Sequence, residues 1–216
     1  MQVSGTRSWR FSETASSTLH AALFVRDTFA LAPLADPSVP PPLDADIAPR
    51  EITDEDRRAA SDQWPSWWSA LLALEIRLDR GGLDWASFAD DRTRAGAAPD
   101  FAGLSNRPAL QRAATSAFRD GSIWAEQAMR PLQRPFGKPV FDSAPLHRIA
   151  QMVAARYAVE IDAVSAQALV FLVPGPWSSV VAPGVLLCSA TAADPAALAA
   201  EAFGSAITGG ALGAVL

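Results

Sequence analysis

The stretch 167–189 constrains the fold most, because it holds two short apolar runs on either side of a segment with Pro-Gly at both ends. The runs at 169–173 and 185–188 are shorter than typical helices and are bounded by proline or glycine, which favours strands. Apolar side chains on both faces of a strand indicate burial on both sides. The sequence therefore predicts a small, mostly antiparallel sheet centred on strands near 167–173 and 185–189.

Helix signals surround this sheet. The clearest begins at Thr53, which is suited to cap a helix with three acidic residues in its first turn. Apolar residues then recur at spacings of three and four: Trp64, Trp67, Leu71, Leu74 and Leu78. Similar patterns predict helices over 106–130, with a break at 120–122, over 145–158, and over 194–207, where Asp194-Pro195 is typical of a helix start. These elements predict an α+β fold in which four or five helices pack on the sheet.

The composition along the chain suggests three parts. Residues 1–31 are expected to form an N-terminal strand and helix, and 51–216 the main α+β domain. Between them, 32–50 is a proline-rich connector that includes Pro40-Pro41-Pro42 and is expected to be extended. The alternative is a single domain on which the N-terminal segment docks. A second use of the connector, as a proline-rich ligand for a partner's aromatic groove, stays open.

The charge and the cysteine content indicate which kinds of partner the protein binds and in which compartment it lies. The net charge of -5 argues against a non-specific nucleic-acid binder, so a nucleic-acid partner is not expected. The segment 107–156 is basic and is flanked by acidic segments, which either neutralise it within the fold or leave a surface for an acidic partner. One cysteine allows no internal disulfide, and no apolar run is long enough to span a bilayer. We therefore expect a soluble, cytoplasmic protein without a signal peptide and with no membrane partner.

Motifs for catalysis or cofactor binding are absent from the sequence. With two histidines and one cysteine, a structural zinc site is excluded, and we expect no metal and no cofactor. Cys188 ends an apolar run and is expected to be a buried, unreactive thiol. Asp90 and Asp91 are a possible carboxylate pair, but adjacent side chains point apart, so a solvated acidic turn is expected.

Four residues remain as candidates for a site. His147, beside Arg148 and with Arg156 further along the same predicted helix, is the one candidate for a general base or an anion-binding group. Trp177 lies in the predicted loop between the two strands, where it either covers the sheet or anchors a partner. We therefore assign Trp177, Arg148 and Arg156 to ligand or partner binding, and His147 as a candidate catalytic residue.

The leading hypothesis is a non-catalytic protein-interaction or accessory protein whose partner is another protein or a second copy of itself. It rests on the missing catalytic motifs, the seven tryptophans, the proline-rich connector and the apolar C-terminal tail at 211–216. The alternative is a hydrolase or transferase that acts on an anionic substrate through His147 and nearby arginines. The interaction hypothesis expects Trp177 or the C-terminal tail to be at least partly exposed in the isolated chain or buried by a second one. The enzyme instead requires a concave pocket onto which His147 and basic side chains converge.

Overall fold

The computed structural model describes residues 8–32, 36–80, 85–133 and 139–209, so the C-terminal tail at 211–216 lies outside the described residues. Over these ranges the chain has six α-helices and one four-stranded sheet, so the predicted α+β class is confirmed. The chain divides into two compact units. The sheet unit comprises 1–15 and 135–216, and the helical unit comprises 16–134. The helical unit is thus inserted in the sequence of the sheet unit, while the domain boundaries expected from composition stay a prediction.

The sheet is mixed, and the expectation of a mostly antiparallel sheet is wrong. Its strands are β1 (Arg10–Thr14), β2 (Ser165–Phe171), β3 (Ser178–Ala182) and β4 (Val185–Ser189), in the order β1-β2-β4-β3. β2 is parallel to both β1 and β4, and only β3 and β4 pair antiparallel. The two predicted strands, β2 and β4, are the central ones, and their continuous apolar runs are typical of buried parallel strands. β3 occupies part of the predicted loop and reverses the chain, so that β4 returns parallel to β2.

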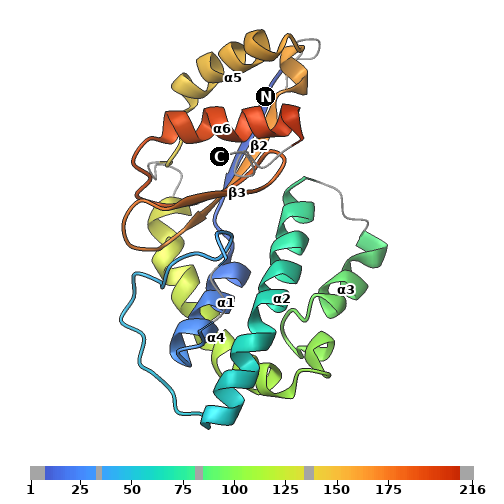
Figure 1. Ribbon diagram of the computed structural model, residues 1–216, viewed down its shortest axis with the longest axis vertical. Coiled ribbons are helices and arrows are strands. Elements are labelled where there is room, and N and C mark those ends of the chain that lie inside the picture. Colours follow the sequence, from blue (N-terminus) through green and yellow to red (C-terminus); the bar gives the residue numbers. More distant parts are fainter. Residues whose placement is uncertain (1–7, 33–35, 81–84, 134–138, 210–216) are drawn as a thin grey trace. The chain divides into compact units, whose positions relative to one another are not determined.

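Two helices cover one face of this sheet (Figure 1). They are α5 (Ser143–Tyr157) and α6 (Pro195–Thr208). α6 contacts β2, β3 and β4, and α5 packs against α6. The ring of Phe203 on α6 meets Phe11 of β1 edge to face, with 5.5 Å between centroids. The predicted start of α6 is confirmed, because the Asp194 carboxylate accepts a hydrogen bond from the Ala197 backbone N at 3.0 Å.

The helical unit contains the other four helices, which are α1 (Ser17–Thr28), α2 (Asp54–Asp79), α3 (Trp85–Arg94) and α4 (Pro108–Gln133). α1 packs against both α2 and α4. Thr53 caps α2 as predicted, since its hydroxyl accepts a hydrogen bond from the Asp56 N at 3.1 Å. The indole N–H groups of Trp64, Trp67 and Trp68 each donate to a backbone carbonyl, so these buried rings leave no polar group unpaired.

Two local predictions in this unit are wrong. α4 continues through 120–122, where a break was expected. A Cβ atom at Gly121 would lie 2.8 Å from Cβ of Phe24, so the glycine allows α1 and α4 to approach closely and does not end a helix. α3 (Trp85–Arg94) includes Asp90 and Asp91, where a solvated acidic turn was expected. Asp91 on α3 is buried and pairs with Arg77 at 3.3 Å and Arg94 at 2.9 Å, so it is not part of a solvated turn.

Candidate functional site

The start of α5 is held by a strand that is far away in the sequence. Both carboxylate oxygens of Glu13 on β1 accept backbone hydrogen bonds, one from Val140 N and one from Phe141 N, each at 3.0 Å. The next residue, Asp142, caps α5 by accepting from Ala144 N at 3.4 Å. The helix therefore begins at Ser143, before the predicted start at 145. The position of α5 in the sheet unit is therefore fixed by side chains that bind main-chain N–H groups.

The outer face of α5 combines an apolar side chain with two cations. Leu146, Ile149 and Val153 point inward and are buried, as the helical spacing indicates. Met152, on another face, is 57% exposed. Arg148 and Arg156 are also exposed and lie one turn before and one turn after it. We call Arg148, Met152 and Arg156 the α5 strip. It contains two of the three residues that the sequence assigned to partner binding.

The α5 strip carries two exposed guanidinium groups. In the part of the chain that the structure describes, no carboxylate pairs with Arg148 or Arg156. The guanidinium carbon of Arg156 lies 5.7 Å from the centre of the Tyr157 ring, a cation–π contact that leaves its charge in place. The strip therefore presents positive charge on either side of an exposed methionine.

His147 precedes this strip and is also exposed. Its Nδ1 accepts a hydrogen bond from the indole Nε1 of Trp9 at 2.8 Å. Because an indole N–H only donates, Nδ1 must carry a lone pair, and in the neutral ring the proton is on Nε2. In this arrangement the lone pair of the His147 Nδ1 is occupied by the Trp9 indole N–H.

Trp177 lies at the end of the sheet where β2 and β4 finish. It is half-buried, and its ring meets that of Phe171 edge to face, with 6.2 Å between centroids. Its backbone N donates to the Ser189 Oγ at 3.2 Å, and its carbonyl accepts from the Ser189 N at 2.9 Å. Among the residues with described positions, no hydrogen bond or ring contact joins Trp177 to the α5 strip.

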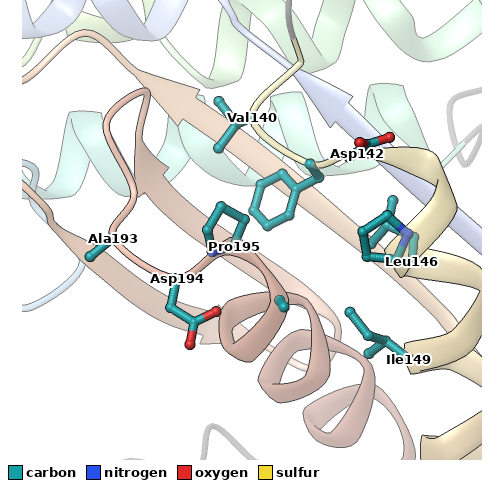
Figure 2. Close-up of a pocket in the computed structure, with 10 residues that line it drawn as sticks. Val140, Asp142, Leu146, Ile149, Ala193, Asp194 and Pro195 are labelled. Carbon is teal, nitrogen blue, oxygen red and sulfur yellow. The ribbon is translucent and has the colours of Figure 1, made fainter.

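A cavity of about 260 Å³ lies where α5 and α6 begin (Figure 2). Its walls are mainly apolar and include Phe141, Leu146 and Pro195. Asp142 and Asp194 also line it, but their carboxylates cap the two helices. Neither His147 nor Arg148 lines it. The sequence does not indicate this cavity, although it predicts the two helices that form it, over 145–158 and 194–207.

Among the described residues, the remaining reactive groups do not form a catalytic or metal-binding centre. Burial, with a smaller contribution from the charge of Glu13, raises the pKa of the Cys188 thiol to about 12, which keeps it protonated and unreactive. Over the described residues, no three or more His, Cys, Asp or Glu side chains gather as they would around a metal ion. Nor does any helix in those ranges have the length and apolar character that a membrane crossing requires.

Comparison with known proteins gives no further information about the function of this chain. No protein-family model, curated protein or solved structure matches this chain. The functional argument therefore rests on the residues and contacts described above.

Proposed function

We propose that this protein is a non-catalytic interaction protein, and that it binds an acidic segment of another protein through the α5 strip. The observation that carries this proposal is Met152, a large apolar side chain that is 57% exposed in the middle of a helix. Methionine and arginine are both enriched at protein interfaces, where the apolar side chain loses water and the guanidinium groups bind carboxylates. A partner that offers acidic residues around an apolar one complements the strip in charge and polarity.

The surroundings of His147 support a non-catalytic role over the alternative enzyme. A general base needs a free lone pair within reach of the substrate, but Trp9 binds the Nδ1 of His147. The cavity between α5 and α6 does not include His147 among its lining residues. The thiol of Cys188 is buried and has a raised pKa. These contacts of the described residues support the interaction protein over the hydrolase or transferase.

The test compares three forms of the full chain as bait in extracts of its own cells, with quantitative mass spectrometry. One form is unchanged, the second carries Arg148→Glu and Arg156→Glu, and the third carries Arg119→Glu and Arg130→Glu. Arg119 and Arg130 are exposed on α4, so the third form has the same change in charge at a different place. We expect an acidic protein that the first and third forms retain and the second loses by about tenfold or more.

The affinity of that acidic protein for the unchanged chain should also fall as the salt concentration rises, because salt screens exposed ion pairs. A second copy of the chain is the other partner to consider, and sedimentation of the purified protein detects it directly. Met152→Glu should then dissociate the complex. The proposal fails if no protein distinguishes the α5 variant from the α4 variant and sedimentation gives a monomer for both.

A further inference from the structure

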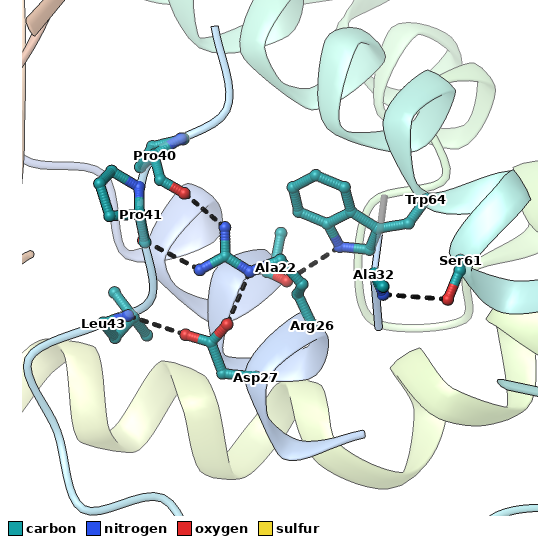
Figure 3. Close-up of polar contacts among 9 residues, drawn as sticks. All are labelled: Ala22, Arg26, Asp27, Ala32, Pro40, Pro41, Leu43, Ser61 and Trp64. Atoms are coloured by element: carbon teal, nitrogen blue, oxygen red, sulfur yellow. Dashed lines mark hydrogen bonds and ion pairs between the residues drawn. The ribbon is translucent and has the colours of Figure 1, made fainter. Parts of the chain in front are cut away.

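The proline-rich connector is bound by side chains of the helical unit at 38–43 (Figure 3). Proline has no backbone N–H, so Pro40-Pro41-Pro42 offers three carbonyl acceptors and no donor. A surface that recognises such a run must therefore supply donors for the carbonyls, and an acceptor only where the prolines end. This requirement can be compared directly with the groups that α1 and α2 present.

Donors on α1 and α2 bind two of the three proline carbonyls and the carbonyl of Ser38. Arg26 on α1 donates from Nη1 to the Pro40 carbonyl at 2.6 Å and from Nη2 to the Pro41 carbonyl at 2.9 Å. Trp68 on α2 donates from Nε1 to the Ser38 carbonyl at 3.2 Å. The first backbone N–H after the prolines, that of Leu43, donates to Asp27 Oδ2 at 2.8 Å. Donors and the acceptor thus occur in the order that the segment requires.

Contacts outside the segment hold these groups in place. The Arg26 Nε donates to Asp27 Oδ1 at 2.6 Å, and the Arg26 guanidinium carbon lies 5.7 Å from the centre of the Trp64 ring. Trp64 and Trp68 stack with 5.4 Å between centroids and 13° between ring planes. The side chains are therefore oriented by one another, so the surface does not depend on the segment alone for its arrangement.

The segment contacts this surface through only part of its length. Pro40 and Leu43 are buried, whereas Pro42 is exposed. An open cavity of about 460 Å³ lies beside Pro42 and is bounded also by Arg26 and Asp27. The surface thus continues past the prolines that it binds.

We propose that Arg26, Asp27, Trp64 and Trp68 form a recognition site for proline-rich peptides, which the chain fills with its own segment 38–43. An aromatic surface with side-chain donors is the chemistry by which proteins bind extended proline segments. A proline-rich segment of a partner binds there when the internal one is displaced. The internal segment competes at the high effective concentration of a tethered ligand, so it acts as an inhibitor of its own site. This inference is independent of the α5 strip.

The test measures binding of a fluorescein-labelled peptide with the sequence of 38–44, Ser-Val-Pro-Pro-Pro-Leu-Asp, by fluorescence anisotropy. Leu43→Asp in the full chain should release the internal segment, because it places a second carboxylate beside Asp27. Ala48→Asp is the matched control, since it adds the same charge at an exposed position of the connector. Circular dichroism and thermal unfolding establish that each variant is folded.

We expect Leu43→Asp to bind the peptide at least about tenfold more tightly than the unchanged chain or Ala48→Asp. Adding Arg26→Ala should abolish this binding, and a peptide with three alanines in place of the prolines should not bind. A folded Leu43→Asp variant that ignores the peptide, or binds the alanine peptide equally well, overturns the proposal. If Leu43→Asp does not fold, the double variant Pro40→Gly and Pro41→Gly takes its place under the same criteria. If neither folds, the segment is an obligatory part of the core and the proposal is wrong.

Discussion

Glu75 is a half-buried acid on α2 whose ionisation depends on pH in a predictable direction. Burial raises its pKa above the ordinary value of 4.5, and this effect exceeds three opposing ones, which are the hydrogen bonds from Ser16 and Thr18 and the charge of Arg92. The folded state therefore binds this proton more tightly than the unfolded state. The contribution of Glu75 to stability is greatest below pH 4.5 and is lost as the pH rises through the raised pKa.

Glu75→Gln removes the charge and keeps a carbonyl oxygen that can accept the same hydrogen bonds. We expect its melting temperature to exceed that of the unchanged protein by roughly 2–4 °C at pH 8, with the difference shrinking toward pH 4. Differential scanning calorimetry at several pH values measures this. Asp62→Asn, an exposed position on the same helix, is the control and should show no such gain. A variant less stable at pH 8 than the unchanged protein would mean that the ionised carboxylate gains more from its donors than it loses by burial.

Single residues could be predicted from the sequence where their role is local. The caps at Thr53 and Asp194 follow from neighbouring residues, and burial of Cys188 follows from its apolar run. The bond between Trp9 and His147 joins residues 138 positions apart, and no local pattern marks it. The candidate site was therefore predicted in part. The sequence identified Arg148 and Arg156 as candidates but not Met152, because only the fold shows that the side chain of Met152 stays exposed.

At the scale of elements, the close approach of α1 and α4 depends on Gly121. In an exposed helix, replacing glycine by alanine stabilises by about 1 kcal/mol, because alanine restricts the unfolded chain. At Gly121 the new Cβ would lie 2.8 Å from Cβ of Phe24 and 3.1 Å from the Ala21 Cα, so backbone atoms would have to move. We expect Gly121→Ala to destabilise by roughly 1–3 kcal/mol, as overpacking does.

Chemical denaturation measures this change, with Thr115→Ala as its control on an exposed part of α4. That control also replaces a poorer helix former by alanine, so it should leave stability unchanged or slightly raised. If both variants stabilise the protein by the same amount, the close contact between Gly121 and α1 is not what limits the side chain at this position.

The same glycine shows why element boundaries were only partly predictable. A glycine in a helical pattern indicates either a break or a close contact, and only the position of Phe24 decides between them. Strand direction had a similar ambiguity. The runs that became β2 and β4 identify buried strands, but their parallel pairing depends on β3, whose residues lack the apolar pattern of a central strand. The direction of pairing depends on β2, β3 and β4 together, so the sequence pattern of any one strand does not show it.

At the scale of the whole molecule, the helical unit is one continuous stretch of chain, whereas the sheet unit is formed from both ends. The helical unit has an aromatic core of its own. Trp67 meets Phe101 and Phe118 with centroid distances of 6.3 and 6.2 Å, and Trp64 stacks on Trp68. A continuous segment with its own core has what it needs to fold independently.

We therefore expect residues 16–134, expressed alone, to give a helical circular dichroism spectrum and a single cooperative thermal transition. The indole N–H signals of Trp64, Trp67 and Trp68 should be dispersed in an NMR spectrum, because each donates to a different backbone carbonyl. Trp67→Ala in the same fragment is the control. It removes the ring that joins α2 to Phe101 and Phe118 and should cost about 3–5 kcal/mol, enough to abolish the transition in a small domain. A fragment that is helical but melts without cooperativity, with collapsed indole signals, would show that the aromatic core does not form without the strands that flank it in the sequence.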